Sequence, residues 1–269
     1  MAAPRIAAHR GGAALWPENS LTAFAGALAL GVDLLEFDVH QSADGEPVVI
    51  HDATLDRTTE GTGTVCAQPA SALRRLRLRD RDGALTGDHV PLLDDVLALA
   101  SRGGAELLLE VKGPAFSVRY GRAPAGQLEI VPGPRYDGLE ERVLAHLRAS
   151  GVIDRTNVMA FNPAVIARVR SLAPAQRTTL LVGRNHVESA GTRPAATVEW
   201  AERLGVTDLG PGHTLVDAEV VAAARARGLG LIVWTPNAES EMRRLATLGV
   251  DVITTDHPDL ALCLRGGAR

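Results

Sequence analysis

Residues 5–40 read RIAAHRGGAALWPENSLTAFAGALALGVDLLEFDVH, and the pattern in this stretch decides the fold. Residues 5–9 form a short β-type run, residues 20–30 have helical periodicity, and residues 34–40 form a second apolar β-type run. Gly31 follows the helical stretch, where a left-handed C-cap forms most easily. This order of strand, helix and strand is typical of a βαβ unit with parallel strands.

The same alternation continues along the chain. The expected strands are residues 5–9, 34–40, 106–112, 157–161, 178–183, 206–209, 230–234 and 251–255, and the expected helices are residues 20–30, 92–101, 139–149, 163–172, 198–204, 218–227 and 240–248. Eight strands with outer helices close naturally into a barrel, whereas an open doubly wound sheet normally has fewer strands. We therefore predict an α/β fold, a (β/α)8 TIM barrel, that forms one domain over residues 1–269.

Two stretches interrupt this alternation. Residues 47–52 follow the turn-like pair Asp44-Gly45 and predict a small β-hairpin insertion after strand 2. Residues 113–138 are rich in Gly and Pro and predict a long loop after strand 3. Both follow barrel strands, so both are expected at the C-terminal face, where the chemistry of such barrels takes place.

Composition excludes several classes of protein. The chain has 269 residues, of which 46% are hydrophobic, so it can bury one large core. Its formal charge of -4 provides no basic field for nucleic acid or for an anionic membrane. Cys66 and Cys263 lack metal-type spacing. No signal peptide and no run of about 18 apolar residues is evident, so we expect a cytoplasmic protein without stable membrane insertion.

Acidic residues stand in two neighbouring expected strands. Glu36 and Asp38 are two residues apart in an apolar run and therefore point to one face, and Glu110 lies near the end of the next strand. Converging carboxylates repel one another by about 4 kcal/mol per pair at about 4 Å and an effective dielectric of about 20. Protonation would relieve this repulsion, but three acids are also the ligands that Mg2+ or Ca2+ prefers. We therefore predict a site for one divalent cation.

Two histidines are expected on the same side of the barrel. His9 ends the first strand, and His51 ends the added hairpin. A lone histidine in such a place is more often a hydrogen-bonded core or capping residue. Beside an acid cluster, the two imidazoles can instead serve as general acid and general base, because imidazole titrates near neutral pH.

Cations and one aromatic residue complete the candidate site. Arg10 precedes two glycines, and a guanidinium beside a glycine backbone suits an anion. Lys112 would add a second positive group. Trp234 ends an apolar strand in a chain with only 3% aromatic residues, so it forms either ordinary barrel packing or a wall of a substrate pocket.

Short motifs in order along the chain resemble the glycerophosphodiester phosphodiesterase family. They are H-R-G at 9–11, P-E-N-S at 17–20, G-x-D-x-x-E-x-D at 31–38, D-G at 44–45, H-D at 51–52, L-x-R-T-T-x-G-x-G at 55–63, E-x-K at 110–112, V-W-T-x-N at 233–237 and G-V-D-x-I-x-T-D-x-P at 249–258. The resemblance implies metal-dependent hydrolysis of a small glycerophosphodiester to glycerol 3-phosphate and an alcohol. It implies that His9 and His51 are catalytic, that Glu36, Asp38 and Glu110 hold the metal, that Arg10 and Lys112 contact phosphate, and that Trp234 lines the substrate pocket.

Several alternatives stay open. Glu18 and Asn19 match the P-E-N segment, but they could instead cap the helix that begins near Ser20. The enzyme could be a lysophospholipase D-like phosphodiesterase, or a barrel metallohydrolase in which the two histidines bind Zn2+ or Mn2+. A barrel that only binds phosphorylated ligands is a non-enzymatic alternative. The preferred alcohol, the choice between Mg2+ and Ca2+, the role of residues 113–138 and the oligomeric state stay open as well.

Overall fold

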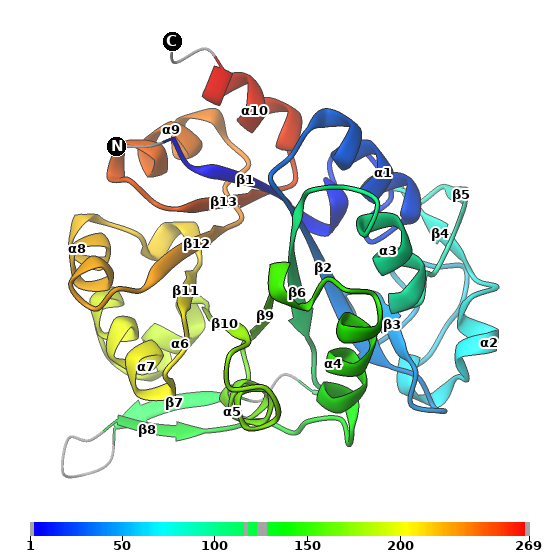
Figure 1. Cartoon of the computed structure of the whole chain (residues 1–269), viewed down its shortest axis with the longest axis horizontal. Helices are drawn as coiled ribbons and strands as arrows, with labels where there is room; N and C mark the ends of the chain where they lie inside the picture. The colour runs from blue at the N-terminus through cyan, green and yellow to red at the C-terminus, as the bar shows by residue number, and fades with distance from the viewer. Residues whose placement is uncertain (1–2, 116–117, 123–127, 267–269) are drawn as a thin grey trace.

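A computed structural model of the chain describes residues 3–115, 118–122 and 128–266. Its centre is a closed barrel of parallel strands surrounded by helices (Figure 1). The barrel strands are β1 (Arg5–Ala8), β2 (Leu34–Gln41), β6 (Glu106–Val111), β9 (Thr156–Ala160), β10 (Arg177–Val182), β11 (Asp208–Pro211), β12 (Gly230–Trp234) and β13 (Val252–Thr255). Strand β1 pairs in parallel with both β2 and β13, which closes the barrel. The predicted TIM barrel is confirmed.

Helices follow the barrel strands along the chain. They are α1 (Leu21–Leu30), α3 (Leu93–Ala100), α4 (Leu139–Ala149), α5 (Pro163–Leu172), α6 (Arg184–Ser189), α7 (Thr197–Leu204), α8 (Ala218–Ala226), α9 (Glu239–Leu248) and α10 (Pro258–Gly266). Helices α6 and α10 are additions to the predicted set. Among the described residues, no helix has the length and apolar character needed to cross a bilayer.

The alternation of side chains along β2 aims its acids at the barrel interior. Leu35, Phe37 and Val39 belong to the large apolar cluster that includes residues of the surrounding helices. Leu34 belongs instead to a smaller cluster to which most of the barrel strands contribute. Because side chains alternate with a period of two, Glu36 and Asp38 lie on the same face as Leu34, further toward the C-terminal end of the strand.

The N-cap of α1, the helix that follows β1, is neither Glu18 nor Asn19. The Ser20 hydroxyl accepts a hydrogen bond from the Ala23 backbone N–H at 2.9 Å and is the N-cap of α1. The Asn19 amide instead donates to an Asp38 carboxylate oxygen at 2.9 Å. The capping role considered for Glu18 and Asn19 is therefore wrong, because the adjacent serine satisfies the helix end.

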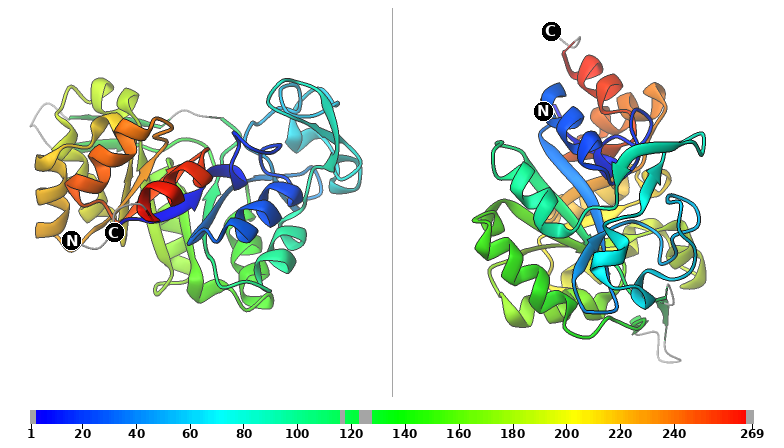
Figure 2. Two further views of the ribbon diagram at one scale, coloured as in Figure 1. Left: turned by 90° about the horizontal axis from the view of Figure 1, so that it is seen from above. Right: turned by 90° about the vertical axis from the view of Figure 1, so that its right-hand side faces the viewer.

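The segment after β2 forms a small unit beside the barrel. Strand β3 (Pro47–Val49) pairs antiparallel with β2, so the added hairpin strand is present but only three residues long. Helix α2 (Ala70–Leu73) and the hairpin β4 (Arg77–Arg79) and β5 (Leu85–His89) follow. Leu73 of α2 and Leu78 of β4 join residues around β3 in a separate apolar cluster. Figure 2 shows this unit, in cyan, at one end of the molecule.

The prediction of a long loop over residues 113–138 is wrong in part. The segment contains strand β7 (Arg119–Arg122), which pairs antiparallel with β8 (Leu128–Val131). Tyr120 anchors β7: its ring stacks on Trp200 with centroids 4.3 Å apart, and its hydroxyl donates to the Phe161 carbonyl at 3.3 Å. The Gly and Pro content of the segment favoured a loop in the sequence analysis. The contacts that stabilise the strand come from residues distant in sequence, so no local pattern indicated it.

A buried histidine in α6 makes stability depend on pH. The His186 side chain is buried, its Nδ1 accepts a hydrogen bond from the Gly183 N–H at 3.1 Å, and burial lowers its pKa to about 4 from the usual 6.5. The unfolded chain therefore binds more protons between these values, and the free energy of unfolding falls as the pH falls through this window.

We expect His186 to account for a loss of about 2 kcal/mol in unfolding free energy between pH 7 and pH 5. Urea denaturation at both pH values measures the total loss in the wild type and in a His186→Gln variant, whose amide does not titrate. The variant should lose less on acidification by about that amount. Equal losses in the two proteins would show that His186 does not titrate in this way.

Candidate active site

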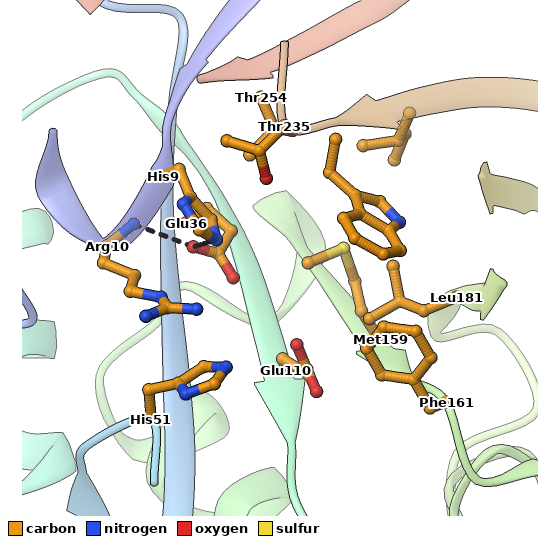
Figure 3. A pocket seen from close by; sticks show the side chains of 12 residues that line it. His9, Arg10, Glu36, His51, Glu110, Met159, Phe161, Leu181, Thr235 and Thr254 are labelled. Carbon is orange, nitrogen blue, oxygen red and sulfur yellow. Dashed lines mark hydrogen bonds and ion pairs between the residues drawn. The ribbon is translucent and has the colours of Figure 1, made fainter. Parts of the chain in front are cut away.

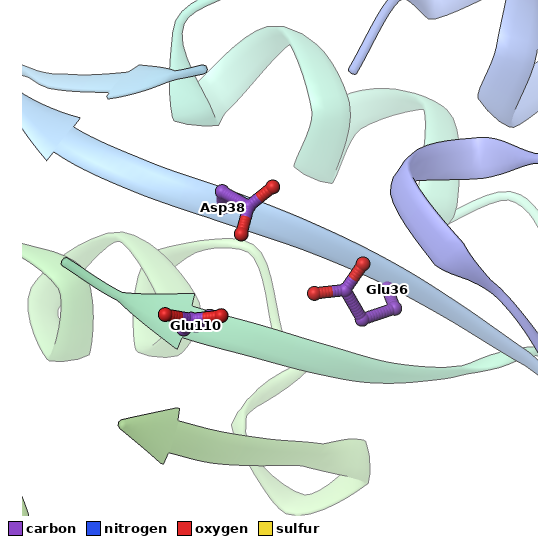
Figure 4. Close-up of side chains that lie close together, drawn as sticks. All are labelled: Glu36, Asp38 and Glu110. Carbon is purple, nitrogen blue, oxygen red and sulfur yellow. The ribbon is translucent and has the colours of Figure 1, made fainter. Parts of the chain in front are cut away.

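Three carboxylates meet inside the C-terminal end of the barrel. Glu36 and Asp38 come from β2, and Glu110 comes from β6, where it lies opposite Asp38 in the strand register. One oxygen from each group lies within 4.8 Å of the others, and all three residues are buried (Figure 4). The structure therefore brings together the three acids that the sequence predicted to converge.

The three acids have unequal pKa values. Burial, together with the nearby charge of Asp38, raises the pKa of Glu36 to about 7. Burial also raises the pKa of Glu110, although Lys112 opposes the effect. Burial alone would raise the pKa of Asp38, but the charges of Lys112 and Arg10 hold it well below its usual range. The cluster therefore carries strong repulsion that two neighbouring cations offset only in part.

Both predicted phosphate-binding cations contact this cluster. The Lys112 ammonium lies 2.9 Å from Asp38 Oδ1 and 2.6 Å from Glu110 Oε1. The Arg10 Nε lies 3.4 Å from Asp38 Oδ2, and the Arg10 backbone N–H donates to Glu36 Oε2 at 2.8 Å. Each cation is thus held at the edge of the acid cluster.

The turn that carries Arg10 has an unusual backbone. Arg10 adopts a left-handed conformation with φ 51° and ψ 32°, which costs of order 1 kcal/mol for a residue with a Cβ. Gly11 also has a positive φ, and a Cβ at this position would lie 2.7 Å from the Cβ of Ala23 in α1. Only glycine fits there, so the H-R-G sequence is what brings Arg10 against β2.

The donor set fits a hard divalent cation. It consists of carboxylate oxygens alone, the ligands that Mg2+ and Ca2+ prefer, and their spacing allows one ion to contact all three groups. A doubly charged ion would relieve the repulsion that raises the pKa of Glu36. Because the cluster found among the described residues contains no histidine, the set does not resemble a histidine-rich zinc centre.

Each candidate catalytic histidine is paired with an aspartate through its Nδ1 atom. His9 Nδ1 lies 2.6 Å from Asp256 Oδ1, while its Nε2 faces Glu36 Oε2 at 4.0 Å. His51 Nδ1 lies 2.6 Å from Asp52 Oδ1. A carboxylate in this position selects the tautomer and orients the ring, as it does in other acid–base centres.

The two histidines differ in basicity. Burial alone would lower the pKa of His9, but Glu36 and the hydrogen bond to Asp256 raise it above 6.5. Burial, reinforced by Lys112 and Arg10, lowers the pKa of His51 to about 4 in spite of Asp38. Two imidazoles whose environments separate their pKa values can hold opposite protonation states, which an acid–base pair requires.

Two of the acids, Glu36 and Glu110, line one pocket of about 120 Å3 together with both histidines and Arg10, and its opposite wall is apolar (Figure 3). Trp234 lies in that wall and also packs against the apolar cluster inside the barrel. Its indole N–H donates to the Gly210 carbonyl at 2.8 Å, and its ring meets Phe161 edge to face at 5.5 Å. Trp234 is therefore held rigidly beside the polar groups.

A second pocket, of about 470 Å3, adjoins the first. The two share His51, Glu110 and Phe161. Ala115 and Val118, from the segment of residues 113–138, line the second pocket, and so does Lys112. The inserted segment therefore forms part of the wall next to the candidate chemistry.

Sequence reasoning missed the residues that orient the histidines. Asp52 and Asp256 stand in the H-D and T-D motifs, so the motifs marked their positions but not their partners. Asn237, from the V-W-T-x-N motif, holds Asp256 through its side-chain amide at 2.6 Å. The contact between His9 and Asp256 joins opposite ends of the chain, so no local pattern predicts it, whereas His51 and Asp52 are neighbours in sequence.

Known proteins match this chain over nearly its whole length. The model of the glycerophosphoryl diester phosphodiesterase family matches residues 9–260. A glycerophosphodiester phosphodiesterase of Caldanaerobacter subterraneus is 30% identical over 97% of this chain and 98% of its own length.

Solved structures agree with this match. A glycerophosphodiester phosphodiesterase from Agrobacterium tumefaciens is 27% identical, with a TM-score of 0.75 over 97% of this chain and 99% of that one. A phosphodiesterase from Oleispira antarctica, solved with the product sn-glycerol-3-phosphate, is 25% identical, with a TM-score of 0.78 over 97% and 96%. The chain therefore belongs to the glycerophosphoryl diester phosphodiesterase family, a family of phosphoric diester hydrolases.

Proposed function

We propose that this protein hydrolyses glycerophosphodiesters to glycerol 3-phosphate and an alcohol, using one divalent cation, Mg2+ or Ca2+, and two histidines. The observation that carries the proposal is that His9 and His51, each paired with an aspartate, line one pocket with Glu36 and Glu110 of the buried three-carboxylate cluster. Family membership supports the substrate class, and the relative from Oleispira antarctica was solved with sn-glycerol-3-phosphate as its product.

In this proposal Glu36, Asp38 and Glu110 hold the cation. When bound, the cation supplies positive charge that stabilises the phosphoryl oxygens during the reaction. Arg10 lines this pocket and Lys112 lines the adjoining one, and both contact the carboxylates, so we expect each to contact the phosphate of the substrate. A phosphodiester repels nucleophiles, and these groups neutralise its charge.

The histidines move the protons of the reaction. A bond forms between phosphorus and the attacking oxygen, and the bond between phosphorus and the alcohol oxygen breaks. One imidazole accepts the proton of the nucleophile, and the other returns a proton to the departing alcohol. The nucleophile is either the neighbouring hydroxyl of the glycerol, which gives a cyclic phosphate that water then opens, or water itself. Trapping of a cyclic phosphate in a single turnover separates the two routes.

We also propose that residues 1–269 act as one domain. The pairing of β1 with β13 supports this proposal, because the first and last barrel strands lie side by side. A metallohydrolase with histidine ligands is less well supported, since each imidazole engages an aspartate and the metal-type cluster consists of acids. A lysophospholipase D-like activity differs only in the substrate and is included in the assay below.

A coupled assay for glycerol 3-phosphate tests the proposed function. Glycerophosphodiesters with different alcohols, and a lysophospholipid, are assayed with EDTA and again after Mg2+ or Ca2+ is restored. Release from at least one glycerophosphodiester, dependent on the added cation, is the expected result. If none of the glycerophosphodiesters releases glycerol 3-phosphate, the proposal is refuted.

The second pocket leads to a prediction on selectivity. A larger side chain at Ala115, which is exposed and lines that pocket, reduces the space beside the phosphate. We expect Ala115→Trp to change the ratio of kcat/KM values between a methyl ester and a bulkier ester of glycerol 3-phosphate by roughly 10-fold. Val131→Trp is the matched control, because Val131 is also exposed, lies in β8 and is not among the residues that line this pocket. Unchanged ratios in Ala115→Trp would contradict the prediction.

A further inference from the structure

Arg57, in the L-x-R-T-T motif, binds two carboxylates, and each of these contacts a residue that lines the pocket. Its Nε and Nη2 donate to the two oxygens of Asp52 at 2.7 and 3.0 Å. Its Nη1 and Nη2 donate to the two oxygens of Glu18 at 2.7 and 2.8 Å. Four charge-assisted hydrogen bonds from one planar guanidinium fix the relative positions of the two acids.

Asp52 and Glu18 each contact a residue of the candidate site, so fixing these two acids also restricts that residue. Asp52 Oδ1 lies 2.6 Å from His51 Nδ1, and Glu18 Oε1 accepts from Arg10 Nη1 at 3.0 Å. His51 follows β3, whereas Arg10 follows β1, so the two belong to different loops. Arg57 is therefore the bridge of a continuous chain of contacts between a candidate acid–base residue and a candidate phosphate ligand.

Packing alone does not hold His51 in place. Its side chain is 32% exposed, and that of Asp52 is 26% exposed. Each side chain is thus only partly enclosed by its neighbours, so hydrogen bonds add to packing in restricting its rotation. Asp52 has both oxygens engaged by Arg57, which leaves it one orientation in which it can also contact the imidazole.

We propose that Arg57 is a positioning residue of the reaction, which holds His51 through Asp52 and Arg10 through Glu18. The inference rests on the proposed function of the same site. Arg57 does not line the candidate pocket, so its effect reaches the reacting groups through these two acids.

The chain offers a matched control for this proposal. Arg77 lies in the same small unit, and its Nε and Nη2 donate to Glu60 at 3.1 and 2.8 Å. The Arg77 side chain is 47% exposed and that of Arg57 is 49% exposed, so either truncation removes a partly exposed, paired arginine. The Arg77–Glu60 pair does not contact the acid cluster or either candidate catalytic histidine.

The test compares Arg57→Ala, Arg57→Lys and Arg77→Ala in the full chain with its cation. We expect Arg57→Ala to lower kcat/KM by roughly 10- to 100-fold, the range usual for residues that orient a site's direct ligands. Arg57→Lys should recover little, because an ammonium lacks the planar fork. Free guanidinium at millimolar concentration should partly restore Arg57→Ala, and Arg77→Ala should keep wild-type kinetics with a similar melting temperature.

A double-mutant cycle adds a second measurement. If Arg57 acts through Asp52, then Arg57→Ala should cost little more in an Asp52→Ala background. Wild-type kinetics in Arg57→Ala, an equal loss in Arg77→Ala, a loss that only follows the melting temperature and is not restored by guanidinium, or fully additive losses would each overturn the proposal. An inactive wild type on every glycerophosphodiester would instead refute the proposed function, so the two failures are distinguishable.

Discussion

His51→Ala and His9→Ala are each expected to lower kcat for glycerol 3-phosphate release by about 10^2- to 10^4-fold, the usual contribution of an acid or base. Both imidazoles line the pocket with Glu36 and Glu110, and each is oriented by an aspartate at its Nδ1. Truncation removes a proton carrier from the reaction but leaves the barrel core intact. Steady-state kinetics together with circular dichroism and thermal melting measure the two effects separately.

His146→Ala is the control for these variants. His146 in α4 also pairs through Nδ1 with an aspartate, Asp94, but it lies outside the pocket. Its replacement removes a histidine–aspartate pair of the same kind without touching the site, so turnover should stay close to that of the wild type. Near-normal turnover in His9→Ala or His51→Ala would remove that histidine from the mechanism.

Removal of the cation with EDTA, followed by dialysis, is expected to reduce activity by roughly 10^2-fold or more, because a bound cation contributes several kcal/mol to the stabilisation of developing charge. Restored Mg2+ or Ca2+ should return the activity, and the more effective ion identifies the preferred metal. Glu36→Gln should weaken cation binding in isothermal titration calorimetry, since an amide provides one neutral oxygen in place of a carboxylate. This titration measures binding independently of turnover.

Glu140→Gln provides the matched control. Glu140 in α4 is a buried acid paired with a cation, Arg135, at 2.8 Å, but it is not part of the cluster. Its replacement should leave cation affinity unchanged. Full activity after chelation and dialysis would refute metal dependence, and unchanged affinity in Glu36→Gln would place the cation elsewhere.

The convergence of the three acids could be predicted because it follows from local rules. Side chains alternate along a strand, so Glu36 and Asp38 must share a face, and parallel neighbours place Glu110 at the same end of the barrel. The orientation of His9 could not be predicted in this way. Asp256 contacts His9, which is 247 positions away in the chain, and nothing in the T-D motif indicates that His9 is its partner.

The sequence by itself determined the eight-stranded barrel and the end at which its polar side chains gather, because both follow from hydrophobic periodicity along single strands and helices. Only the tertiary structure decided that residues 113–138 include two paired strands, of which Tyr120 anchors the first, that Asn19 contacts Asp38 rather than capping a helix, and that Arg57 bridges two loops. Those features depend on hydrogen bonds and ring contacts between segments far apart in the chain. Their free energy exists only once the barrel has brought the segments together.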